Sequence, residues 1–180
     1  SLIQYIELGE IGIPKIQRHF IWKNPKVRDL FDSMYKGFPI GYLLFWQNSF
    51  TDDSKTIGTD SKQKIPRLLL IDGQQRLTSI YAVVKSIPVI REGYDPKKIR
   101  IAFNPILEKF EVADAAIQRD KTYIPDISIL WSDDTDLFEV VDKYLETLQA
   151  SREVDDEEKK KIRKAISKLR NLLSFPFTAL

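Results

Sequence analysis

Residues 72–76 place a carboxylate, two carboxamides and a guanidinium within one short stretch of chain. The guanidinium of Arg76 can bind a phosphate or a carboxylate bidentately. The carboxylate of Asp72 is a ligand that hard divalent cations such as Mg²⁺ accept. These residue types therefore indicate an anion site. The alternative is a structural ion pair between Asp72 and Arg76 across a tight turn, and the residues alone leave both interpretations open.

The surrounding sequence predicts that this stretch joins a strand to a helix. Residues 68–71 form a continuous apolar run, which is typical of a strand buried on both faces. Gly73 permits a tight turn. After it, apolar residues recur at the spacing of one helical face: Leu77, Ile80, Tyr81 and Val84. We expect this helix to end near Pro88. Backbone N–H groups and the positive end of the helix dipole meet at such a junction, so it suits an anion.

Two motifs resemble those of a known family. Residues 72–78, Asp-Gly-Gln-Gln-Arg-Leu-Thr, resemble the DGQQR signature of the N-terminal domain of GmrSD-type, modification-dependent restriction proteins. A second signature of that family, a Pro followed by Gln-Arg and an aromatic residue, appears upstream at Pro14, Gln17, Arg18 and Phe20. The resemblance extends over about the first two-thirds of the chain. The family's last motif has no clear counterpart before Leu180 and the chain lacks an initial Met, so we expect a fragment of a longer protein.

The resemblance implies an α+β fold with a ParB/sulfiredoxin-like core, a small mixed β-sheet and a helical C-terminal extension. It also implies a regulatory or sensor domain that binds and hydrolyses a nucleoside triphosphate in a restriction (anti-phage) system. The residues that it assigns to the nucleotide are Gln17, Arg18, Gly73, Gln74, Gln75 and Arg76.

The same resemblance assigns chemical roles within the turn. Arg76 and the backbone amides of residues 73–75 would hold phosphate oxygens. Asp72 would bind Mg²⁺ or orient water, and Gln75 would position the attacking water, as glutamine does in some phosphoryl-transfer enzymes. The division of roles between Gln74 and Gln75 stays open. The expected catalytic residues are thus Asp72, Gln75 and Arg76, and the expected metal ligand is Asp72.

The expected partners are a nucleoside triphosphate with Mg²⁺, DNA contacted through the full-length protein, and a downstream nuclease domain or subunit. The lone His19 cannot build a His-Asn-His metal-nuclease motif, so we expect no nuclease activity from this fragment. The competing interpretation is a non-catalytic, ParB-like DNA-binding or nucleotide-gated module, in which the same turn contacts DNA phosphates.

Composition narrows the choice of chemistry. The 180 residues contain no Cys, which excludes disulfides, thiolate metal sites and sulfiredoxin chemistry. The net charge is only +2, so any DNA contact must come from local patches. Neither a Walker A loop nor a Gly-x-Gly-x-x-Gly pattern occurs. With no apolar run of about 20 residues and no leader of signal-peptide type, we expect a cytoplasmic protein without membrane contact.

The remaining pattern predicts further elements. Asn24 caps a helix over residues 24–36 that Gly37 ends, and an aromatic-rich strand covers residues 40–47. A long loop spans residues 48–64. Residues 98–103 and 109–112 form a hairpin, and residues 123–130 are extended.

The end of the chain is predicted to be helical. Asp136 caps one helix, and residues 155–173 form the last. We divide the chain into a ParB/sulfiredoxin-like core over residues 1–130 and a helical extension over residues 131–180. Two lesser expectations concern side chains: Trp22 and Trp46 are assigned to the core, and the lysine run at residues 159–161 to a solvated helix face.

Overall fold

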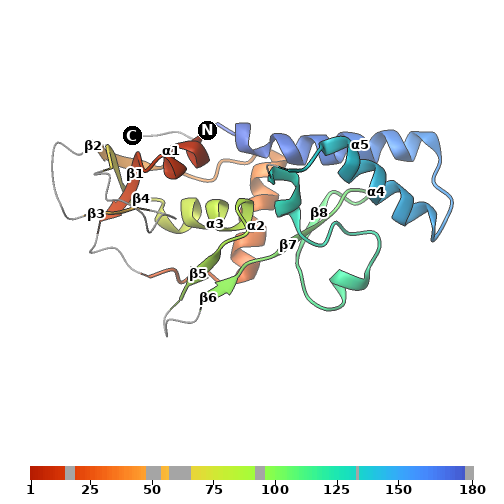
Figure 1. Cartoon of the computed structure of the whole chain (residues 1–180), viewed down its shortest axis with the longest axis horizontal. Helices are drawn as coiled ribbons and strands as arrows, with labels where there is room; N and C mark the ends of the chain where they lie inside the picture. The colour runs from red at the N-terminus through yellow and green to blue at the C-terminus, as the bar shows by residue number, and fades with distance from the viewer. Residues whose placement is uncertain (15–18, 48–53, 57–65, 92–95, 133, 177–180) are drawn as a thin grey trace.

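A computed structural model of the chain describes residues 1–14, 19–47, 54–56, 66–91, 96–132 and 134–176, and their fold is mixed α+β (Figure 1). A small sheet lies at one end of the elongated molecule, and the two C-terminal helices lie at the other. Helices α2 and α3 lie between them. The expected α+β class with a small mixed sheet and C-terminal helices is confirmed, and the arrangement is compatible with a ParB/sulfiredoxin-like core.

The sheet contains four strands in the order β2-β4-β1-β3. Strand β4 (Leu68–Asp72) runs parallel to β1 (Ile11–Pro14) and antiparallel to β2 (Leu44–Gln47). Strand β3 (Ser54–Thr56) pairs antiparallel with β1. Part of the expected loop at residues 48–64 is therefore a strand, and the rest of that loop lies outside the described residues. The predicted aromatic strand is also shorter, because it begins only at Leu44.

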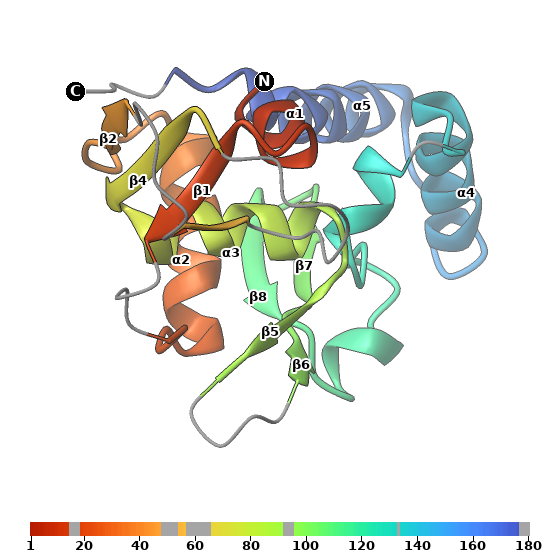
Figure 2. The same cartoon turned by 60° about the vertical axis from the view of Figure 1, so that its left-hand side comes forward.

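Strand β4 is buried on one face and not on both. Leu70 is fully buried, whereas the next residue, Ile71, is 38% exposed. Successive side chains of a strand point to opposite faces, and α2 and α3 lie on one side of this sheet (Figures 1 and 2). A continuous apolar run thus predicted the strand correctly but overstated its burial.

Helix α2 (Asn24–Lys36) buries the residues that its periodicity selects: Val27, Leu30, Phe31, Met34 and Tyr35. It ends at Gly37, whose φ of 76° is the left-handed conformation that glycine adopts without strain. The predicted cap is wrong, however. Asn24 is the first helical residue, and its side-chain oxygen accepts a hydrogen bond from Nη2 of Arg91 at 2.7 Å.

Helix α3 (Gln74–Val84) begins where the sequence predicted and buries its whole expected stripe. It ends at Val84, four residues before Pro88. Helix α1 (Leu2–Glu7) precedes β1, and Ser1 caps it.

Two hairpins follow α3. Strands β5 (Pro88–Ile90) and β6 (Pro96–Lys98) form the first, which the sequence did not predict. Strands β7 (Ile101–Asn104) and β8 (Lys109–Val112) form the second, which was predicted, although Lys98 belongs to the first. The expected extended segment at residues 123–130 is wrong. Only Ile124 makes a bridge, to Phe103, and a 3₁₀ helix, η2 (Ile127–Trp131), follows.

The C-terminal part comprises α4 (Leu137–Gln149), α5 (Asp156–Arg170) and the 3₁₀ helix η3 (Asn171–Ser174). Asp136 caps α4 as predicted, because its side chain accepts a hydrogen bond from the Phe138 amide. The lysine run lies on a solvated face: Lys159 and Lys161 pair with acidic residues of the same helix, at 2.9 and 2.8 Å.

A single buried apolar cluster joins these parts. The rings of Tyr35, Phe103 and Phe110 pack together and connect α2 to the second hairpin. The hydroxyl of Tyr35 also donates to the carbonyl of Ala165 in α5 at 3.4 Å. Residues before and after position 130 therefore share this core, and the division of the chain at that position stays a prediction. Among the described residues, no helix combines the length and the apolar character needed to cross a membrane.

Candidate functional site

The turn between β4 and α3 requires glycine at position 73. Strand β4 ends at Asp72, and Gly73 is the N-cap of α3 with a φ of 92°. A side chain there would be strained by this backbone conformation, and its Cβ would collide with the side chain of Leu43. The tight turn brings the carboxylate of Asp72 next to the first turn of α3, where helix N–H groups and the positive end of the dipole lie.

The guanidinium of Arg76 is fixed by two hydrogen bonds. Its Nη1 donates to the carbonyl oxygen of Ile40 at 2.6 Å, and its Nη2 donates to Oδ2 of Asp72 at 3.1 Å. The backbone of Gly41 lies directly against it, so that a Cβ at that position would collide with Nη1. The structural ion pair, which the sequence offered as the alternative to an anion site, is therefore present.

The two partners of this ion pair differ in exposure. The side chain of Arg76 is 17% exposed, whereas that of Asp72 is 75% exposed. Exposed ion pairs contribute about 0–1 kcal/mol, so an anion that replaced Asp72 at Nη2 would cost little. The Ile40 carbonyl would continue to hold Arg76 in place.

Gln75 is buried, with 5% of its surface exposed, and both ends of its side-chain amide are engaged by backbone. Its Oε1 accepts a hydrogen bond from the Ile21 amide at 2.9 Å, and its Nε2 donates to the carbonyl of His19 at 3.1 Å. These contacts give Gln75 a structural role in this conformation. They leave the water-positioning role that the sequence ascribed to it without support.

A pocket of about 210 Å³ lies at the start of α3. It is lined by residues 71–76 and, from an earlier part of the chain, by Trp22 and Lys26. The ammonium group of Lys26 lies 4.6 Å from the centroid of the Trp22 ring. Sequence reasoning missed Lys26; its position in the first turn of a predicted helix, four residues after Trp22, was the available signal.

The structure brings together most of the predicted nucleotide site. Asp72, Gly73, Gln74, Gln75 and Arg76 all line the pocket. Gln17 and Arg18, expected to complete it, lie outside the described residues. In the part of the chain that the structure describes, no three His, Cys, Asp or Glu side chains gather as a metal site.

The two tryptophans that were assigned to the core differ. Trp22 is half-buried and packs against the apolar cluster, whereas Trp46 is 66% exposed, so the assignment is wrong for Trp46. Trp46 lies in β2, which is an edge strand of the sheet. Aromatic content predicted the strand, but it could not show which of its faces the helices cover.

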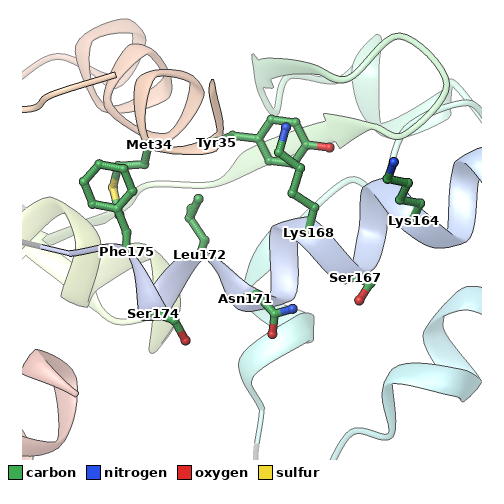
Figure 3. A pocket seen from close by; sticks show the side chains of 9 residues that line it. All are labelled: Met34, Tyr35, Lys164, Ser167, Lys168, Asn171, Leu172, Ser174 and Phe175. Carbon is green, nitrogen blue, oxygen red and sulfur yellow. The ribbon is translucent and has the colours of Figure 1, made fainter. Parts of the chain in front are cut away.

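A second, larger pocket of about 530 Å³ lies between α2 and the end of α5 (Figure 3). The ring of Phe175 lies beside Met34, and the ammonium group of Lys168 lies 4.0 Å from the centroid of the Tyr35 ring. The polar side chains of Ser167, Asn171 and Ser174 also line it. None of the site residues predicted from the sequence is among the residues that form this pocket.

Comparison with known proteins agrees with the motif at the start of α3. The model of one family, described as the N-terminal domain of the GmrSD restriction endonuclease, matches residues 1–179. A curated relative, an uncharacterized protein of Methanocaldococcus jannaschii, is 28% identical over 118 residues, which cover 60% of this chain and 20% of the relative. The chain thus spans about a fifth of the length of that relative.

Proposed function

The chain belongs to the family of GmrSD restriction endonuclease N-terminal domains, and from this premise we propose that it binds the phosphates of a nucleoside triphosphate at the start of α3. In this proposal, nucleotide binding regulates the restriction system of which the domain is a part. Nucleotide hydrolysis is a further step, which the test below measures separately. DNA and a downstream nuclease domain or subunit are the expected partners of the full-length protein.

The observation that supports this proposal is that two cations from different helices line one pocket. Arg76 comes from α3 and Lys26 from α2, and both line the pocket at the N-terminus of α3. Asp72 is the carboxylate among the pocket residues, so the charge of the lining is +1 before the helix dipole is counted. Helix N-termini and arginine forks both favour phosphate oxygens.

The size of the pocket limits which part of a nucleotide we assign to it. Pockets that enclose drug-sized ligands measure about 300–1,000 Å³, whereas this one measures about 210 Å³. The described residues therefore accommodate phosphate groups, and the ribose and base extend beyond them.

The single carboxylate of this pocket, Asp72, is sufficient for a Mg²⁺ ion that binds together with the nucleotide. Mg²⁺ keeps several waters and takes one or two protein carboxylates together with substrate phosphates. Asp72 is well exposed at the pocket and can serve as that single ligand. When bound, Mg²⁺ would neutralise part of the phosphate charge. Because Gln75 is held by backbone, phosphate binding is better supported by the contacts than hydrolysis.

A panel of the four ribonucleoside triphosphates with Mg²⁺ tests this proposal. Binding is measured by calorimetry and turnover by phosphate release, for this chain and for the full-length protein. We expect Lys26→Gln and Arg76→Ala each to weaken binding by about ten- to a hundredfold, because a hydrogen bond to a charged group contributes about 1.5–3 kcal/mol. Lys160→Gln, at an exposed position of α5, is the matched control and should change nothing.

Lys26→Gln is the cleaner variant of the two. Lys26 is exposed, whereas Arg76 also anchors the Ile40 carbonyl. The proposal fails if no nucleotide binds to either protein. It also fails if Lys26→Gln reduces affinity for DNA while no nucleotide effect is measurable, which would make the site a DNA-binding module.

A further inference from the structure

Residues 19–23 form neither helix nor strand, yet they carry Trp22 to the pocket and lead into the first turn of α2. Backbone groups outside regular structure must find other partners when they are buried. In this segment the partners are two side chains that are distant in sequence, Gln75 and Arg91.

Gln75 holds the segment from the side of α3. Its amide supplies one acceptor, to the Ile21 N–H, and one donor, to the His19 carbonyl. A neighbouring β-strand would offer residues 19 and 21 the same pair of groups. Since the backbone of Gln75 belongs to the first turn of α3, this one residue connects the N-terminus of α3 to the segment that carries Trp22 to the pocket.

Arg91 holds the segment from the other side. It follows strand β5, and its Nη2 donates both to the carbonyl of Trp22 at 2.9 Å and to Oδ1 of Asn24 at 2.7 Å. Its guanidinium also lies 5.8 Å from the centroid of the buried Phe20 ring. Arginine is suited to this task because its planar fork serves several acceptors and stacks on an aromatic ring.

We propose that Gln75 and Arg91 are positioning residues, which clamp residues 19–24 from two sides and so set Trp22 and Lys26 as the second wall of the pocket. The role of this wall in ligand binding rests on the proposed function; the clamp itself does not. Two consequences follow. Movement of the first turn of α3 is passed to the Trp22 wall through Gln75, and affinity for phosphate depends on Arg91, although Arg91 does not line the pocket.

The clamp is tested without ligand by hydrogen exchange and by the indole N–H signals in NMR spectra. In Gln75→Leu, which keeps the bulk but loses both hydrogen bonds, the Ile21 amide should exchange at least about fivefold faster. The Trp22 indole signal should also shift or broaden. Trp131 is the internal control, because its indole donates to the Arg170 carbonyl at 3.0 Å and lies by the C-terminal end of α3, whereas Gln75 is in the first turn of that helix.

Gln75→Glu distinguishes the hydrogen bond from the Ile21 amide from the one to the His19 carbonyl. A glutamate can accept from the Ile21 amide but cannot donate to the His19 carbonyl, so we expect the Ile21 amide to keep more of its protection than in Gln75→Leu. Arg91→Gln removes the other half of the clamp and should move the Trp22 signal while the Ile21–Gln75 bond persists. If Gln75→Leu also disturbs the Trp131 signal, its effect is not confined to the clamp. In that case the Trp22 signal of Arg91→Gln decides whether the clamp exists.

With ligand, the readout is the affinity for a nonhydrolysable nucleoside triphosphate with Mg²⁺. Releasing a wall that must then be ordered on binding should weaken affinity by about five- to tenfold in both Gln75→Leu and Arg91→Gln. An unchanged Ile21 amide and Trp22 signal would overturn the clamp. If the Trp22 signal changes but the affinity for the nucleotide does not, the proposed role of the Trp22 wall in ligand binding is wrong. Failure of the wild-type protein to bind would instead overturn the proposed function and leave the exchange result standing.

Discussion

Replacing Gly41 by alanine tests whether the guanidinium of Arg76 packs against the backbone of Gly41 and binds the Ile40 carbonyl in solution. Gly41 has a φ of 87°, and a Cβ there would collide with Nη1 of Arg76. That atom belongs to the end of a flexible side chain, so the guanidinium can move aside. Its movement, however, breaks the 2.6 Å hydrogen bond to Ile40 and disturbs the one to Asp72.

Gly37 provides the matched control for backbone strain. It has a φ of 76°, and a Cβ there would have nothing within 4 Å. Gly37→Ala should therefore show only the cost of a left-handed alanine, about 1–2 kcal/mol. Gly41→Ala should lower the free energy of unfolding by about 1–2 kcal/mol more, which is the lower end of the value for a bond to a charged group because Arg76 can still reach water.

Urea denaturation of the two variants gives the comparison, and a double-mutant cycle makes it specific. In an Arg76→Ala background, the extra cost of Gly41→Ala should disappear, while the cost of Gly37→Ala should stay the same. Equal destabilisation by the two alanines in the wild-type background would contradict the expected contact between Gly41 and Arg76. It would show that Arg76 does not rest against Gly41 in solution.

Three other outcomes follow from the contacts. Asp136→Ala removes the cap of α4 and should lower the free energy of unfolding by about 1 kcal/mol, whereas Asp136→Asn should change it little. Burial raises the pKa of Tyr35 and of Tyr144 above the usual 10.0, so their contribution to stability is complete below pH 10 and is lost as the pH rises. Spectrophotometric titration should therefore show these phenols ionising only as the fold opens, and Tyr35→Phe should reduce the loss of stability above pH 10. A hydrogen bond from Arg152 lowers the pKa of Glu158 from 4.5. The stability that this bond contributes is present above pH 4.5 and is lost as the pH falls through the folded-state pKa; Arg152→Met should raise that pKa toward 4.5 in a carboxyl NMR titration.

Periodicity predicted the parts of the fold that depend on local pattern. Helices α2 and α3 bury the residues chosen from their 3.6-residue spacing, and the Gly37 and Asp136 signals mark a helix end and a helix start correctly. These signals succeed because a helix satisfies its backbone within itself, so that its boundaries are determined by nearby residues.

Elements that depend on distant partners were predicted less well. Strand β3 has only three residues and exists because β1 lies beside it. Asn24 looked like a helix cap, but it is the acceptor for a guanidinium 67 residues away in sequence. Such contacts leave no local periodicity, and for that reason the sequence could not separate a cap from a tertiary hydrogen bond.

The candidate site shows the same division. The turn at residues 72–76 was located from its motif and from the change in apolar spacing. The sequence did not locate the second wall, formed by Trp22 and Lys26, or the Arg91 contact that holds it. Each of these joins segments that are far apart in the chain. The family resemblance also implied that Gln75 positions the attacking water; that role stays a prediction, and in this structure its buried amide binds backbone.

The ion pair between Asp72 and Arg76 does not argue against an anion site. A guanidinium has five N–H donors, and the two described bonds engage two of them. The Ile40 carbonyl and the backbone of Gly41 contact Nη1 of Arg76, whereas Asp72 contacts Nη2, so the guanidinium would keep its anchor if the carboxylate turned toward a metal ion, as we propose. A cation held in place before its ligand arrives loses little conformational freedom on binding. The contacts that make Arg76 a structural residue are therefore also consistent with the proposal that it binds phosphate.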